Sequence, residues 1–87
     1  INLALGNYEQ AEANLQSSIA LAERLNADYE KGLALFYLGQ LYSTLLKEKG
    51  NRRRCQQSLR QAAAIFSRLG ARADLAQVAQ LQSRLDL

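Results

Sequence analysis

The sequence repeats itself after 44 residues, and this internal repeat constrains the fold more than any other feature. A Gly-Asn pair stands at residues 6–7 and again at residues 50–51. Between residues 6 and 27, seven positions hold the same residue as the position 44 further on: Gly6, Asn7, Leu15, Ala20, Arg24, Leu25 and Ala27. Repetition at a period of roughly 20–50 residues is typical of helical solenoids, in which stacked units share a continuous core.

Apolar residues recur at helical spacing in four segments, which predicts an all-α fold. We expect breaks at residues 6–7, 26–28, 50–51 and 70–71, because Asn is a good N-cap and Gly terminates helices. The predicted helices cover residues 8–25, 28–49, 52–69 and 72–86. Because the connections are short, successive helices should run antiparallel. The absence of Pro agrees with this assignment.

The second predicted helix is apolar over most of its circumference between residues 33 and 46. A helix of this kind is covered on several sides. We therefore expect it to pack on the first and the third helix together, as in a row of stacked helices.

Three sets of residues resemble the tetratricopeptide repeat. Leu38, Gly39 and Tyr42 match the family's Leu-Gly followed by an aromatic residue. The family's turn and its small residues are matched by Gly6, Asn7, Tyr8, Ala11 and Leu15, and again by Gly50, Asn51, Cys55, Leu59 and Ala62. The period exceeds the usual length of about 34 residues, Arg52 replaces the second aromatic residue, and the helix-ending Pro is missing. The chain is therefore most similar to the longer repeats of bacterial regulators and kinesin-light-chain-like scaffolds.

The resemblance implies antiparallel helix pairs stacked as an α-α solenoid over residues 1–87. It also gives Gly39 a role, because a missing side chain lets the partner helix approach closely. A glycine in the middle of a helix costs about 1 kcal/mol relative to alanine, so the packing gained must offset that cost.

By the same resemblance, the first helix of each pair lines a concave groove that binds a protein or peptide partner. The positions carried over are Leu33, Phe36, Gln40, Ser43, Thr44, Gln77, Gln80 and Arg84. Some family members clamp a terminal carboxylate with Lys and Asn, whereas this chain has Phe36 and Gln40. The sequence leaves open whether Phe36 faces the groove or is buried against a further repeat.

Charge is unevenly distributed along the chain. Residues 1–46 hold two basic and five acidic residues, a net charge of −3, whereas residues 47–87 hold nine basic and three acidic residues, a net charge of +6. A basic cluster comprises Lys47, Lys49, Arg52, Arg53 and Arg54. It is either a binding patch for an anionic partner or a solvated turn. Nucleic acid is disfavoured, because the nearby Tyr37 and Tyr42 match packing positions.

The residue inventory does not favour an enzyme. The chain has no His, its single Cys55 has no partner for a disulfide or a metal site, and no Gly-rich phosphate loop follows a strand. We therefore expect no catalytic residues, metal or cofactor. Cys55 is either a small buried residue or a reactive thiol.

We also expect a cytoplasmic protein, because no run approaches the roughly 18 apolar residues of a membrane span. The chain begins at Ile1, and we expect it to be a fragment of a longer protein.

Three functions remain open at this point. The first is a scaffold that binds a peptide or partner domain in the groove. The second is polyanion binding, to an acidic protein or a nucleic acid, through the basic cluster. The third is a structural spacer or oligomerisation unit, which would associate through exposed apolar ends at Ile1, Leu3, Leu5, Leu81, Leu85 and Leu87.

Overall fold

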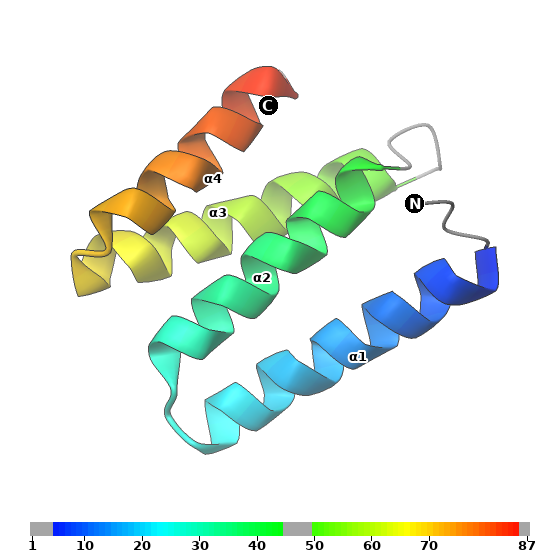
Figure 1. Ribbon diagram of the computed structural model, residues 1–87, viewed down its shortest axis with the longest axis horizontal. Coiled ribbons are helices and arrows are strands. Elements are labelled where there is room, and N and C mark those ends of the chain that lie inside the picture. The colour runs from blue at the N-terminus through cyan, green and yellow to red at the C-terminus, as the bar shows by residue number, and fades with distance from the viewer. Residues whose placement is uncertain (1–4, 45–49, 86–87) are drawn as a thin grey trace.

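Four α-helices make up residues 5–44 and 50–85, which are the residues that the computed structural model describes, with side chains from Tyr8 onward (Figure 1). The helices are α1 (Leu5–Arg24), α2 (Asp28–Ser43), α3 (Asn51–Leu69) and α4 (Arg72–Arg84). These two ranges contain no strand. The all-α class and the number of helices predicted from the sequence are therefore confirmed for the described part of the chain.

The helices lie in a row in chain order. Extensive contacts join α1 to α2, α2 to α3 and α3 to α4, and the largest contact is between α2 and α3. Successive helices run antiparallel, and α1 and α4 lie at opposite edges of the array (Figure 1). The apolar circumference of α2 is thus covered by α1 on one side and α3 on the other, as its sequence predicted.

The turn between α1 and α2 has the same backbone conformation as the turn between α3 and α4. Asn26 and Gly70, which are 44 residues apart, both have left-handed φ angles of 54° and 71°. The next residue in each turn also matches, with φ and ψ of −91° and 78° at Ala27 and of −80° and 78° at Ala71. At these two turns, the repeat in the sequence is therefore also a repeat of backbone conformation.

Hydrogen bonds that close the two turns correspond as well. The Ala27 amide donates to the Ala22 carbonyl at 2.8 Å, and the Ala71 amide donates to the Phe66 carbonyl at 2.9 Å. Bonds of this type satisfy the last carbonyls of a helix when the following residue is left-handed. Residues 22–27 and 66–71 can thus be compared position by position.

The core lies between α2, α3 and α4, with further contacts from α1. Its largest fully buried side chains are Phe66, Leu59, Val78 and Cys55. Gly39 is buried where α2 meets α3, and the Cys55 thiol donates to the Gly39 carbonyl at 3.3 Å. The expectation that Gly39 permits close packing of two helices is confirmed.

The predicted start of the first helix was wrong, whereas that of the third was correct to within one residue. Helix α1 begins at Leu5, so Gly6 and Asn7 lie inside the helix and do not precede it. Helix α3 begins at Asn51, after Gly50 with a left-handed φ of 86°. The Asn51 side chain is buried, and its Nδ2 group donates to the Tyr8 hydroxyl at 3.2 Å. The physical reason is that Gly50 supplies the break, which frees Asn51 to join α3 to α1.

The helix ends fall close to their predicted positions. Helices α1 and α3 end at Arg24 and Leu69. Helix α2 ends at Ser43, where the Thr44 amide donates to the Leu41 carbonyl at 3.1 Å. The predicted continuation over residues 45–49 lies outside the described residues. Helix α4 ends at Arg84, before the predicted end at residue 86, which is also outside them.

Candidate partner-binding groove

A surface hollow of about 170 Å³ lies between α2 and α4. Six residues line it: Phe36, Gln40, Gln77, Gln80, Leu81 and Arg84. Five of these six belong to the groove set that the sequence analysis carried over from the family resemblance. The structure thus brings together side chains from two helices that are not consecutive, because α3 holds α2 and α4 on the same side.

The lining combines an apolar base with polar groups at the rim. Phe36 and Leu81 are 7% and 8% exposed, respectively. The three glutamines and Arg84 are exposed. Glutamine amides can donate and accept hydrogen bonds, and the arginine guanidinium donates in a planar fork that matches a carboxylate. The hollow therefore offers groups suited to an extended peptide.

The sequence left open whether Phe36 faces the groove or is buried, and the structure shows that it is both buried in the core and in contact with the groove. Its side chain belongs to the buried core cluster, so the described helices themselves bury it. Its ring also lies 5.9 Å from the ring of Tyr37, which the sequence analysis wrongly matched to a packing position and which is 49% exposed, because it points away from the core. Part of the Phe36 surface forms the base of the hollow. It does not require a further repeat for its burial.

The other three residues of the predicted groove set lie elsewhere on α2. Leu33 is half-buried against the core. The Ser43 hydroxyl donates to the Gln40 carbonyl, and the Thr44 hydroxyl donates to the Leu41 carbonyl at 2.7 Å. These two side chains are engaged at the end of α2, and none of the three lines the hollow.

Leu81 was placed wrongly by the sequence analysis, which assigned it to an exposed end of the solenoid. It is buried, and Leu85 is half-buried against the same core, because both lie on the stripe of α4 that packs inward with Val78. The helical spacing of these three residues was the signal that could have shown it. Ile1, Leu3 and Leu87 lie outside the described residues, and the Leu5 side chain is not described.

The basic cluster is only partly within the described residues. Arg52, Arg53 and Arg54 are exposed in the first turn of α3. Arg54 donates to the Asn51 side-chain carbonyl at 3.4 Å. Lys47 and Lys49 lie outside the described residues.

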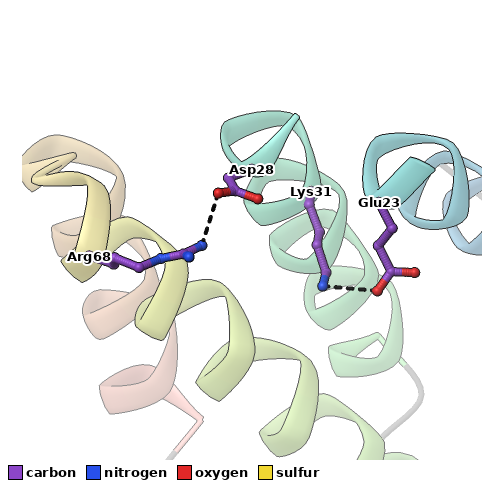
Figure 2. Close-up of polar contacts among 4 residues, drawn as sticks. All are labelled: Glu23, Asp28, Lys31 and Arg68. Atoms are coloured by element: carbon purple, nitrogen blue, oxygen red, sulfur yellow. Dashed lines mark ion pairs between the residues drawn. The ribbon is translucent and has the colours of Figure 1, made fainter. Parts of the chain in front are cut away.

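A second hollow, of about 360 Å³, lies on α2 and α3 and is lined by Lys31, Gln61, Ala64, Ile65 and Arg68. Its two cations are engaged in ion pairs between successive helices (Figure 2). Lys31 pairs with Glu23 at 2.9 Å, and Arg68 pairs with Asp28 at 3.2 Å. The sequence analysis singled out neither the pairs nor the hollow. Because each of these cations is paired with a carboxylate, the hollow presents little unneutralised positive charge to a ligand.

Tyr29 connects the first turns of α2 and α4. Its hydroxyl donates to the Asp74 carboxylate at 3.0 Å, and its ring lies 5.9 Å from the Phe66 ring. The hydrogen bond to Asp74 is the main cause that raises the pKa of Tyr29. This contact is a direct link between α2 and α4.

Cys55 is a packing residue in this structure. Its side chain is fully buried, and burial raises the pKa of its thiol. A thiol with a raised pKa remains protonated near neutral pH, and the thiolate is the nucleophilic form. Of the two interpretations left open by the sequence, the structure favours the small buried residue.

Searches of the described residues give two further findings. Within residues 5–44 and 50–85, no group of three or more Cys, Asp or Glu side chains is placed to hold a metal ion. None of the helices in these ranges is both long enough and apolar enough to cross a membrane.

Comparison of the chain with protein-family models, curated proteins and solved structures finds no match.

Proposed function

We propose that this chain is a tetratricopeptide-like interaction module that binds an extended peptide of a protein partner between α2 and α4. The observation that carries the proposal is the hollow in which Phe36, Gln40, Gln77, Gln80 and Arg84 come together. The open row of helices, the 44-residue structural repeat and the close packing at Gly39 support it further, since stacked helix pairs leave such a groove on one side.

The chemistry of the groove defines the peptide that it would bind. The glutamine amides pair with the N–H and C=O groups of an extended backbone, and Arg84 pairs with a carboxylate. Phe36 and Leu81 are almost completely buried, so the base of the hollow offers little apolar surface and its polar groups dominate recognition. The expected ligand is an extended segment with an acidic residue opposite Arg84.

The proposal makes the chain a binding module of a bacterial cytoplasmic regulator or scaffold, and not an enzyme. In this setting, the groove would recruit a protein partner or a sister domain. No step of the proposed function uses a cofactor or a metal.

A selection from a random peptide library on the immobilised chain tests the proposal. Selected peptides should lose binding about tenfold or more with Arg84→Glu, because a hydrogen bond to a charged group contributes roughly 1.5–3 kcal/mol. They should lose about two- to tenfold with Gln80→Ala, because a neutral hydrogen bond contributes roughly 0.5–1.5 kcal/mol. Arg53→Glu serves as the matched control, since it reverses an exposed arginine outside the groove. Peptides that lose binding with Arg53→Glu and keep it with Arg84→Glu would refute groove binding.

A second candidate function, polyanion binding, rests on the three consecutive exposed arginines at the start of α3. Positive charge is disfavoured at a helix N-terminus, so these residues do not stabilise the helix locally. Heparin and mixed-sequence DNA are suitable probes. If the cluster binds polyanions, the affinity falls steeply with salt and is lost when Arg52, Arg53 and Arg54 are changed to Glu.

A further inference from the structure

A hollow of about 220 Å³ lies at the edge of the array, where α1 turns into α2. It is lined by Ser18, Leu21, Ala22, Leu25, Ala27 and Glu30. Leu21 and Leu25 are 53% and 67% exposed, respectively, the two highest values among the exposed large apolar residues of the described chain. The hollow therefore combines exposed apolar side chains with one carboxylate.

The structural repeat relates this hollow to an occupied position 44 residues further along the chain. Ala22 corresponds to Phe66 and Glu30 corresponds to Asp74. At the second position, the Tyr29 ring lies 5.9 Å from the Phe66 ring, and its hydroxyl donates to Asp74 at 3.0 Å. Because the two turns share their backbone angles and hydrogen bonds, Glu30 and Asp74 occupy equivalent backbone positions at the starts of α2 and α4, and the longer side chain of Glu30 carries its carboxylate one methylene further out.

We infer that the hollow at the α1–α2 turn is a docking socket for a tyrosine side chain presented by a helix of a protein partner. The ring would lie against Leu21 and Leu25, and the hydroxyl would donate to Glu30. Ala22 in place of Phe66 leaves room for the ring, whereas Leu21 in place of Ile65 keeps the wall apolar. This site lies outside the α2–α4 groove and does not depend on the function proposed for it.

The way that Tyr29 is presented defines the partner helix further. Tyr29 lies in the first turn of α2, and Gly32 follows it on the face that meets α3. A Cβ at Gly32 would lie 2.7 Å from Phe66 Cε1, so only glycine fits there. At the socket, the smaller Ala22 replaces that ring. We therefore expect a helix with tyrosine in its first turn, and because Ala22 is smaller than Phe66, the residue three positions later need not be glycine.

A second copy of the chain fits this description less well. The positions of α4 that correspond to Tyr29 and Gly32 are Ala73 and Ala76. Ala76 is as small as this position needs, but Ala73 lacks the aromatic ring that the socket would hold. A different protein is therefore the expected partner.

Titration of the ¹⁵N-labelled chain with N-acetyltyrosinamide and N-acetylphenylalaninamide tests the socket by NMR. Both ligands should shift the amide signals of the six lining residues, and the tyrosine compound should bind about two- to tenfold more tightly, because it makes one additional hydrogen bond. Glu30→Ala should remove this difference, whereas Glu9→Ala, which removes an exposed carboxylate elsewhere on α1, should preserve it. Absence of saturable shifts at the lining residues would overturn the inference, as would equal affinities for the two ligands.

Ala73→Tyr provides a gain-of-function test with the whole chain. This change adds the missing ring to an exposed position on α4, so one copy could then dock on the α1 socket of the next. Sedimentation velocity should show self-association of this variant, and Leu21→Ser in the same chain should reverse it. Persistence of the association in the double variant would contradict the socket. Self-association of the unchanged chain that Leu21→Ser abolishes would identify the second copy as the occupant, against the inference.

Discussion

Gly39 and Leu59 are in such close contact that the absence of one side chain makes room for the other. A Cβ built on Gly39 would lie 2.6 Å from Leu59 Cδ2 and 2.9 Å from Leu59 Cγ. Leu59 is fully buried, so it cannot move into solvent. The largest helix contact of the molecule, between α2 and α3, is therefore built around this glycine.

Gly39→Leu should lower the free energy of unfolding by about 1–3 kcal/mol, the usual cost of overpacking a core. The better helix propensity of leucine, worth less than about 1 kcal/mol, offsets only part of this. Urea denaturation followed by circular dichroism measures the change. Gln40→Leu, which places leucine at an exposed position on the same helix, is the control and should have little effect.

A compensating substitution separates overpacking from a general loss of helix stability. Leu59→Ala alone should destabilise the chain, because it leaves a cavity. Combined with Gly39→Leu, it should cost clearly less than the sum of the two single changes, since the new side chain enters the vacated space. Additive costs would show that the contact between residues 39 and 59 is not the cause.

Much of the fold could be predicted from the sequence because its signals are local. The offset of 44 residues identified the two turns at Ala27 and Ala71, and the α2 pattern indicated two packing partners. The backbone conformations at Asn26 and Gly70 explain why: each turn needs one left-handed residue, and Gly and Asn are the residues that adopt it most readily.

Other features depend on contacts between helices that no local pattern encodes. Gly6 and Asn7 look like a helix start, yet α1 runs through them. The joining of Tyr29 to Asp74 depends on how α2 and α4 are placed by α3. Five residues of the hollow between α2 and α4 were named from the family resemblance. Leu81 is an exception to the rule above, because its spacing from Val78 and Leu85 is a local signal of an inward position that was not applied to it.

Tyr8→Phe should reveal the contribution of the hydrogen bond between α1 and α3. The side-chain Nδ2 of Asn51 donates to the Tyr8 hydroxyl at 3.2 Å, and both side chains are buried. Removal of the hydroxyl should cost about 0.5–1.5 kcal/mol, the net contribution of a typical hydrogen bond. Urea denaturation measures this cost, and Tyr37→Phe, which removes the hydroxyl of an exposed tyrosine, is the control. Equal costs for the two variants would mean that the Asn51 contact contributes nothing.

The two ion pairs in Figure 2 should contribute little, despite joining three helices. The side chains of Arg68 and Asp28 are 62% and 47% exposed, and exposed pairs typically contribute about 0–1 kcal/mol. Arg68→Met should therefore lower the free energy of unfolding by no more than about 1 kcal/mol. The effect should shrink further in high salt, because surface charges are screened. A larger, salt-independent loss would contradict this expectation, because methionine keeps most of the apolar length of Arg68 and the loss would then come from the guanidinium contact with Asp28.

Tyr42 should make the stability of the chain fall in alkaline solution. Its hydroxyl donates to the Glu12 carboxylate, and burial followed by this hydrogen bond raises the pKa of Tyr42 from 10.0 to about 12. A group whose pKa is raised on folding contributes stability that is fully present below its unfolded pKa. That contribution should therefore be complete below pH 10 and decline as the pH rises toward 12.

The corresponding measurement is the free energy of unfolding in urea at several pH values across this window. Tyr42→Phe removes the titrating hydroxyl, so its stability curve should be flatter than that of the unchanged chain. Glu12→Gln provides the matched control, because it keeps a hydrogen-bond acceptor but removes the negative charge that opposes ionisation of Tyr42. The decline should still begin near pH 10, but it should end at lower pH and be smaller, because the folded pKa of Tyr42 falls toward its unfolded value. If the curves of all three chains have the same slope, the carboxylate–tyrosine contact between α1 and α2 does not control the alkaline stability.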